Sequence, residues 1–417
     1  MKTILILDLL FAGCFLAING LQQQMSPAKN HQGTHQVRHP VQESEEKRAG
    51  NQVVSKNTEF AYKMYQALAQ KNKDENLFFS PLGISASFSM LTLGAKNYTL
   101  SQLSESLNLR EMPTKTIHKG FHYIIHNLNQ PDRDLQLHLD NVLFIEDDLK
   151  VQKKFLDDIK NIYEAEAFPM NFNDPKKAIK QINNYISQET HGKINNLIKS
   201  LDQGTMILMI NHIYFQAEWE KNFNPKDTKE DEFFLINGKT VKVPMMYRGG
   251  KYKIGYDEQL SCTVIEIPFK GNVIALFMLP DKGKLKKMEE GLNKNKLIQL
   301  RKSLNCSSVD ICLPKFSISG TYNIKKCLSG LGVTRIFDGS ADLTRISPQK
   351  TLKVNQAIQK AVLKMDEKGA EAAGGTSIET LPMTVPKIIK LNRPFLLTII
   401  DNLTNSTLFI GRIVNPK

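Results

Sequence analysis

The chain has 417 residues, of which 41% are hydrophobic and 23% are charged, and its formal net charge is +13 at pH 7. These proportions are those of ordinary globular proteins, and they exclude disordered, collagen-like and coiled-coil chains. The positive surplus favours polyanionic partners, because lysine and arginine attract anions over a long range and release their counterions on binding.

The first residues are typical of a secretory signal peptide. Lys2 precedes an apolar run over residues 3–18, and small residues follow up to Gly20. A membrane anchor needs about 18 or more uninterrupted apolar residues, whereas this run is shorter and contains Asp8. We therefore expect residues 1–20 to be a signal peptide and the protein to be secreted, extracellular and without a membrane partner.

Residues 21–53 are polar, with many glutamines and charges and almost no large apolar side chains. This composition predicts a flexible tail, because such a segment buries too little apolar surface to fold. His31, His35 and His39 recur every four residues in the tail, but a glycine and a proline close by disfavour the helix that would align them. We expect no metal site there.

Helical periodicity begins near Thr58 and continues through Leu68. A second helix follows Pro81 and closes at Gly94, and its apolar residues cover most of the circumference, which predicts deep burial. Further amphipathic helices are expected over residues 114–128, 150–163 and 175–187.

Strand-like runs dominate the rest of the chain. They cover residues 206–216, 241–256, 262–268, 271–279, 309–319, 352–366, 387–400 and 407–414. Helices followed by strands, without regular alternation, predict an α+β fold with large sheets rather than a Rossmann or TIM-barrel architecture.

The cysteine pattern gives no support for a metal site or a cofactor. Four cysteines remain once Cys14 leaves with the signal peptide, which is too few for a disulfide scaffold. Neither a CxxC pair nor a histidine at zinc-finger spacing accompanies Cys306, Cys312 and Cys327. The sequence permits one disulfide between Cys306 and Cys312 or none.

The sequence lacks the short motifs of common enzymes and of nucleic-acid readers. It has no GxSxG, HExxH or GxxxxGK[ST] motif and no GxGxxG between a strand and a helix, so no catalytic residue is assigned and an enzyme is not expected. No zinc-finger, RNP or helix-turn-helix pattern is present, and a secreted protein meets sulfated sugars before nucleic acid, so no nucleic-acid partner is expected.

Four Asn-x-Ser/Thr sequons predict surface glycosylation, at Asn97, Asn305, Asn402 and Asn405.

Residues 369–382 read GAEAAGGTSIETLP and form the most informative segment of the chain. The plain alternative is a flexible linker. In an extended strand, however, Glu371 and Glu379 share one face, while the opposite face begins with the uncharged Ala370 and Ala372. The uncharged face can enter a packed core without burying a charge, which favours a loop that can become a central strand.

Several segments resemble the serpins, and more closely the α1-antitrypsin-like group of that family. Residues 365–373 resemble the serpin hinge, residues 381–384 (LPMT) resemble the bait site, and residues 408–416 resemble the signature. Further matches are NLFFSPLGIS (76–85), THGKINNLI (190–198), NHIYFQAEWEKNF (211–223), VPMM (243–246), LPDKG (279–283), LPKFSI (313–318), LGVTRIFDGSADLTRIS (331–347) and LNRPFLLTII (391–400). Because the matches run in order to the end, the chain is identified as a member of this family with one domain over residues 54–417. Within the group, FHYIIH (121–126) and LPM (381–383) resemble one member in particular.

The resemblance implies an α+β domain with three β-sheets, eight to nine helices and an exposed reactive-centre loop. It implies a monomeric inhibitor of serine proteases, in which the protease acylates the loop and the loop then inserts into the large sheet and distorts the enzyme. The hinge residues that carry over are Glu367, Gly369, Ala370, Ala372 and Ala373.

The resemblance places the reactive bond between Met383 and Thr384, seventeen residues into the loop counted from Glu367. Met383 is long, unbranched and apolar, so the expected partner is a chymotrypsin-like, elastase-like or kallikrein-like protease with an apolar primary pocket. Leu381 is the alternative cleavage position.

The resemblance also implies two polar clusters in the large sheet. At its top, the breach, Lys315 is expected to pair with Glu367 above Trp219, although such a pair can also be an ordinary surface ion pair. Near its centre, the shutter, the polar cluster retains Ser80 and Asn211.

Two departures from the family pattern favour an alternative function, a non-inhibitory carrier or signalling protein. Gly83 and Gln359 stand where the family usually has a serine and a histidine of the shutter. The adjacent Gly374 and Gly375 weaken a strand, which slows insertion.

Residues 282–302 hold much of the positive charge. A solvated helix face is one interpretation, and a site for heparin-like glycosaminoglycan is the other. The candidate residues for that site are Lys294, Lys296, Arg301 and Lys302.

Overall fold

The structure is a computed structural model that describes residues 43–130, 135–348, 352–369 and 386–417. These residues belong to one compact unit that begins at Glu43. Its nine α-helices in the described part of the chain are α1 (Glu45–Lys71), α2 (Pro81–Thr92), α3 (Asn97–Ser106), α4 (Thr114–Leu128), α5 (Lys153–Tyr163), α6 (Pro175–Glu189), α7 (Leu285–Gly291), α8 (Lys294–Ser303) and α9 (Ile324–Ser329).

The strands form two hydrogen-bonded sheets. The five-stranded sheet has the order β10 (Phe316–Asn323), β11 (Gln356–Met365), β4 (Ile207–Ala217), β2 (Leu135–Glu146) and β3 (Glu166–Met170). The nine-stranded sheet has the order β1 (Leu77–Phe79), β14 (Ser406–Ile413), β13 (Phe395–Asp401), β8 (Val273–Pro280), β7 (Cys262–Pro268), β6 (Thr240–Asp257), β9 (Asn305–Pro314) and β12 (Lys387–Lys390), and β5 (Lys229–Phe234) pairs with β6.

The described strands thus form two sheets where three were expected, because the 18-residue strand β6 joins two of them. Its first part pairs with β5, its middle with β9 and its last residues with β7. Because strands twist, a strand of this length turns too far to stay within one flat sheet. Its two ends therefore pair with different neighbours. The expected α+β class is confirmed.

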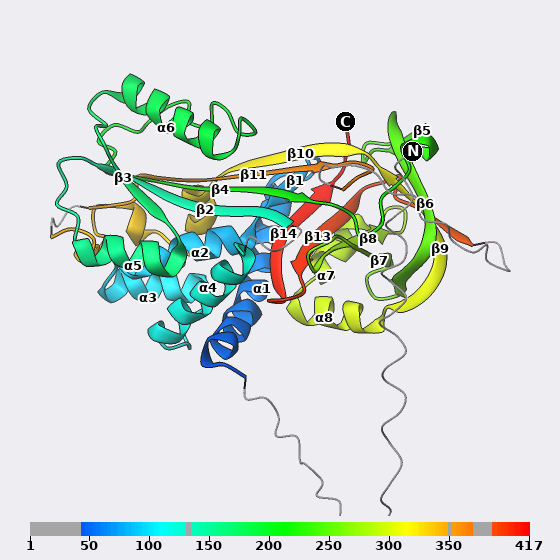
Figure 1. Cartoon of the computed structure of the whole chain (residues 1–417), viewed down its shortest axis with the longest axis horizontal. Coiled ribbons are helices and arrows are strands. Elements are labelled where there is room, and N and C mark those ends of the chain that lie inside the picture. Colours follow the sequence, from blue (N-terminus) through cyan, green and yellow to red (C-terminus); the bar gives the residue numbers. More distant parts are fainter. Residues whose placement is uncertain (1–42, 131–134, 349–351, 370–385) are drawn as a thin grey trace, which may run out of the picture. The chain divides into compact units, whose positions relative to one another are not determined.

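Helix α6 covers one end of one face of the five-stranded sheet, and helices α2 to α5 lie on the other side of the sheet (Figure 1). On one face, Leu208 and Ile210 of β4 belong to an apolar cluster with Ile182 and Ile186 of α6. On the other face, neighbouring residues of β4 join the main core, which includes every apolar residue of the fully buried helix α2. A strand buried on both faces reads as a continuous apolar run rather than an alternating one, which explains the clear strand signal over residues 206–216.

Helix α1 begins at Glu45, so residues 45–53 of the expected flexible tail are helical. Ser44 caps the helix, since its side chain accepts a hydrogen bond from the Lys47 amide at 3.1 Å, and two glutamates occupy the first turn. The buried side of this part consists of small residues, Ala49 and Gly50 among them, which face α4. Small residues give a weak periodic signal, and for this reason the prediction began the helix too late.

Other boundaries differ from the prediction where a loop interrupts an apolar run. The strand expected over residues 309–319 is two strands, β9 and β10, that turn at Lys315. The strand expected over residues 387–400 is β12 and β13, which a loop containing Pro394 separates. Strands β1, β2, β3 and β5 and helices α3 and α9 were not predicted, and helices α7 and α8 were considered only as a solvated helix face over residues 282–302.

Cys306 and Cys312 both lie on β9, and all four cysteines of the described residues are free. Six strand residues span about 20 Å, which is far beyond the reach of a disulfide. The sequence permitted a Cys306–Cys312 disulfide or no disulfide, and the structure has no disulfide between these residues.

Among the described helices, none combines the length and the apolar character that crossing a bilayer requires.

Candidate functional site

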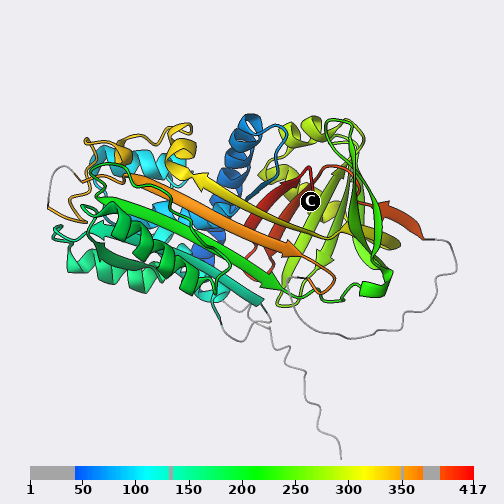
Figure 2. The same ribbon diagram turned by 90° about the horizontal axis from the view of Figure 1, so that it is seen from above.

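The parallel pair β11–β4 lies in the interior of the five-stranded sheet, as Figure 2 shows from above. The pairing runs from Gln356↔Leu208 to Val362↔Tyr214 and ends there, although both strands continue for three more residues. The two strands are therefore already unpaired with each other at the end where residues 366–369 follow β11.

Residues 366–369 form a tight turn that closes β11. Asp366 and Gly369 exchange backbone hydrogen bonds of 2.9 and 3.1 Å, and the Trp219 amide donates to the Lys368 carbonyl at 2.9 Å. Gly369 has a φ of 111°, and a Cβ at this position would collide with the backbone of Ala217 and Trp219. Only glycine fits this approach without strain, so the expected hinge residue has a structural reason for its identity.

The ion pair expected at the top of the sheet is present. Lys315 Nζ lies 2.8 Å from Glu367 Oε2, and the Thr228 hydroxyl donates to Glu367 Oε1 at 2.9 Å. Burial acts to raise the pKa of Glu367, but the hydrogen bonds from Lys315, from its own backbone and from Thr228 outweigh it, so the pKa lies below its usual value. Glu367 is only 8% exposed, so this pair is more than a solvated surface contact. Thr228 belongs to no recognisable motif, and no sequence pattern indicated it.

Trp219 is fully buried beneath this turn. Its ring stacks on Phe269 with centroids 4.2 Å apart, and its Nε1 donates to the Asp366 carbonyl at 3.0 Å. Phe223 packs edge-on against the same ring. The indole therefore holds the first residue of the turn through a hydrogen bond and anchors it to the core.

The central polar cluster connects the five-stranded sheet to helix α2. Gln359 accepts from the Ser80 amide at 3.0 Å and donates to the Ser80 carbonyl at 2.9 Å and to Asn211 Oδ1 at 2.6 Å. Asn211 in turn donates to Asn141 Oδ1 at 2.9 Å, and Ser87 donates to the same oxygen. All five side chains are buried, so Gln359 joins the helix and two strands across a dry interior, where such bonds are strong.

Gly83 makes room for this arrangement. A Cβ at Gly83 would collide with the amide oxygen of Asn211, the atom that accepts the hydrogen bond from Gln359. The two substitutions in the shutter, Gly83 and Gln359, are therefore linked through one shared neighbour, Asn211. Asn141 and Ser87 complete the cluster and were missed by the sequence analysis.

The reactive bond and most of the hinge lie outside the described residues. Met383, Thr384, Ala370, Ala372 and Ala373 belong to this group. The asparagines of the four sequons, in contrast, are described and exposed, as attachment of a glycan requires.

The four candidates for a glycosaminoglycan site do not form one free cationic surface. Lys296 is 7% exposed and pairs with Asp257 at 2.7 Å. Arg301 lies 3.8 Å from Glu266 and donates to Asn402 at 2.8 Å, while Lys294 is half-buried and donates to Ser55. Only Lys302 is exposed. Acids distant in the sequence match two of the four charges, those of Lys296 and Arg301, so the glycosaminoglycan site stays a prediction without the support of one continuous cationic surface.

Comparisons with known proteins show the family and the fold of the chain. The model of the family described as "Serpin (serine protease inhibitor)" matches residues 55–416. Serpin A12 of Homo sapiens is 45% identical over 98% of this chain and 97% of its own length, and alpha-1-antiproteinase of Rattus norvegicus is 42% identical over 86% and 88%. A solved structure of human thyroxine-binding globulin with its hormone is 35% identical, covers 88% of this chain and 100% of its own, and superposes with a TM-score of 0.85.

Proposed function

Because the chain belongs to the serpin family, we propose that it is a secreted inhibitor of serine proteases that have an apolar primary pocket. The observation that carries the proposal is the parallel pair β11–β4 inside the sheet, which ends before the strands do and is followed by the hinge turn. A relative named alpha-1-antiproteinase supports the inhibitory class.

The strand directions favour insertion between β11 and β4. A chain that leaves β11, reverses and runs back in extended form is antiparallel to β11. Because β4 is parallel to β11, the same strand is also antiparallel to β4. Insertion thus replaces one parallel ladder by two antiparallel ladders, which gain backbone hydrogen bonds and have the more stable pairing geometry.

The proposed chemistry is supplied by the protease. Its serine oxygen attacks the Met383 carbonyl carbon, the peptide bond to Thr384 breaks, and the new amine of Thr384 leaves with the proton that the serine gave up. The Met383 carbonyl is then held as an ester on the protease. Inhibition requires that the loop inserts before water hydrolyses that ester, so it depends on the relative rates of the two steps.

Incubation with chymotrypsin followed by denaturing electrophoresis tests the proposal. We expect a complex that survives SDS, together with release of a C-terminal peptide that begins at Thr384 by mass spectrometry. The Met383→Arg variant is expected to transfer this reaction to trypsin, since an arginine pairs with an acidic primary pocket. Cleavage at another bond in the variant would show that Met383 is not the reactive residue.

A second candidate function is that of a non-inhibitory binding protein. The Gly83–Gln359 arrangement, which departs from the family pattern, and the similarity to thyroxine-binding globulin favour this candidate. It predicts that chymotrypsin produces only cleaved protein and no SDS-stable complex, so the same gel distinguishes the two candidates.

A further inference from the structure

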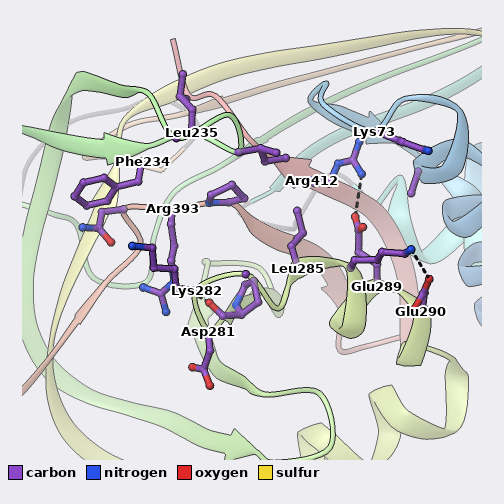
Figure 3. Close-up of a pocket in the computed structure, with 18 of the residues that line it drawn as sticks. Lys73, Phe234, Leu235, Asp281, Lys282, Leu285, Glu289, Glu290, Arg393 and Arg412 are labelled. Carbon is purple, nitrogen blue, oxygen red and sulfur yellow. Dashed lines mark hydrogen bonds and ion pairs between the residues drawn. The ribbon is translucent and has the colours of Figure 1, made fainter.

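A cavity of about 1060 Å³ is lined by elements that take no part in the β11–β4 pair (Figure 3). Its walls come from the end of α1, the end of β5 with the β5–β6 turn, the segment between β8 and α7, helix α7 itself, the loop between β12 and β13, and one residue of β14. This volume is at the upper end of the range for sites that hold small molecules.

Two hydrogen bonds fix the walls to one another. The Phe234 amide at the end of β5 donates to the Asn392 carbonyl at 2.8 Å. One residue further along, Arg393 donates from Nε to the Pro280 carbonyl at 2.8 Å. Three chain segments are thus tied together around the opening, so the cavity is formed before any ligand arrives.

Apolar side chains line much of the cavity. Phe234 is 45% exposed and Ile236 is 42% exposed, which is high for side chains of this size. They share the cavity with Leu285, Pro394 and Ala69. Single exposed apolar residues need no explanation, but several that converge on one hollow are typical of a surface that an apolar ligand covers.

The acidic side chains of the cavity are already matched. Glu289 accepts hydrogen bonds from Arg412 at 3.0 Å and from the Tyr65 hydroxyl at 2.5 Å. Glu290 lies 3.8 Å from Lys286. Asp281 accepts from the Tyr256 hydroxyl at 2.7 Å, and its negative charge also acts on Arg393 at a distance beyond that of an ion pair. The dashed lines of Figure 3 mark the pairs with Arg412 and Lys286.

Three cationic side chains of the cavity form no such close ion pair within the described residues. Within the described part of the chain, Lys73, Lys282 and Arg393 form no ion pair at 4.0 Å or less. Figure 3 shows Arg393 and Lys282 close together beside Phe234, whereas Lys73 lies at the other end. Arg393 is half-buried with its Nε already bonded, so its terminal nitrogens are the donors that remain for a ligand.

We propose that this cavity binds an amphipathic anion, namely an apolar chain or ring system that ends in one carboxylate, sulfate or phosphate group. The anionic group contacts Arg393 and Lys282, and the apolar part covers Phe234, Ile236 and Leu285. A sulfated sugar leaves the apolar walls exposed, and a neutral apolar molecule offers no acceptor to the remaining donors of Arg393 and Lys282. Only a ligand with both parts satisfies the whole cavity.

Calorimetric titration of the full mature protein with dodecanoate tests this proposal. We expect one binding site per chain, an affinity about tenfold lower in Arg393→Gln because a charge-assisted hydrogen bond is lost, and loss of measurable binding in Phe234→Asp. Phe234 is exposed, so its replacement leaves the fold intact, which circular dichroism checks. The matched control is Lys302→Gln, which makes the same charge change on α8 outside the cavity and should bind as the wild type does.

Equal affinity in all four proteins, or no binding to the wild type, would overturn the proposal. Equally tight binding of 1-dodecanol and dodecanoate would also overturn it, because the cations would then contribute nothing. Dodecyl sulfate and dodecyl phosphate, used well below their micelle concentrations, distinguish the headgroups. None of these measurements involves a protease or loop cleavage, so their failure leaves the proposed inhibitory function untouched.

Discussion

At the scale of single residues, the central cluster shows how two unusual side chains depend on each other. Gln359 reaches Ser80 on one side and Asn211 on the other, and Asn211 can take that position only because residue 83 has no Cβ. A buried polar group that loses its partner costs about 1–3 kcal/mol. Each member of the cluster is therefore held in place by the next.

Gly83→Ser is expected to lower the thermal midpoint by a few degrees, because overpacking of a buried site costs about 1–3 kcal/mol. Combining it with Gln359→His, which restores the family's pair, is expected to cost less than the sum of the two single changes. Differential scanning fluorimetry of the four proteins measures this coupling. The control is Gly339→Ser, where a Cβ meets nothing within 4 Å. Strictly additive shifts would show that the two positions are independent.

His118 on α4 is a buried histidine outside the sheet. It is 8% exposed, and its Nδ1 lies 2.7 Å from the Tyr163 hydroxyl. Burial lowers the pKa of His118 to about 4, against a weaker opposing effect of Asp158. In the unfolded chain a histidine titrates near 6.5, so between these values the unfolded state binds the proton and the folded state does not.

The free energy of unfolding should therefore decrease by about 2 kcal/mol between pH 7 and pH 5 on account of this residue. His118→Phe should remove that part of the pH dependence, at the cost of leaving the Tyr163 hydroxyl without its partner at every pH. Urea unfolding at both pH values measures the slope. An unchanged slope in His118→Phe would contradict the assignment.

At the scale of elements, the β11–β4 pair and the turn that follows form one unit. The turn is held by Trp219 through Asp366 and by Lys315 through Glu367. These contacts end at Gly369, where the described residues stop. The first side chain that an inserting strand would place toward the core is that of Ala370, if the alternation of the loop is as the sequence predicts.

Ala370→Arg is therefore expected to change the protein from inhibitor to substrate, since insertion would bury an unpaired charge. Glu371→Arg is the matched control, because the neighbouring side chain faces the other side of the strand. Denaturing gels after reaction with chymotrypsin should show complex for the control and only cleaved protein for Ala370→Arg. Stable complex in both variants would defeat the alternation argument.

At the scale of the whole molecule, the proposed function requires that a strand enters the five-stranded sheet between β11 and β4, whose mutual pairing ends three residues before the strands do. An inserted strand would add ladders on two sides and cover apolar surface between β11 and β4. Under this proposal the intact protein is less stable than the product of cleavage. The free energy for distorting a protease would come from this difference.

Cleavage near Met383 is accordingly expected to raise the thermal midpoint, by about 10 °C or more if a whole strand inserts. Calorimetry before and after limited proteolysis measures the change. The cleaved Ala370→Arg variant should show a much smaller rise, since its strand enters poorly. A midpoint that stays the same or falls in the cleaved wild type would rule out an insertable loop.

The sequence by itself determined the features that depend on local pattern. The strong helical period over residues 114–128 and the run over residues 262–268 predicted α4 and β7 with their observed bounds. Motifs spread along the chain identified the family, and they also indicated the Lys315–Glu367 pair that the structure contains. Such signals depend on residues close together in the sequence or on patterns that one family keeps.

Contacts between distant segments determine which charged and polar groups have partners, and these contacts are visible only in the folded protein. Lys296 looked like part of a cationic surface, but Asp257 neutralises it, and Gly83 looked like a departure until Asn211 gave it a reason. The cavity likewise forms from segments that lie far apart in the chain. The physical reason is that burial and charge pairing belong to contacts across the fold, and no local pattern records which side chains will meet there.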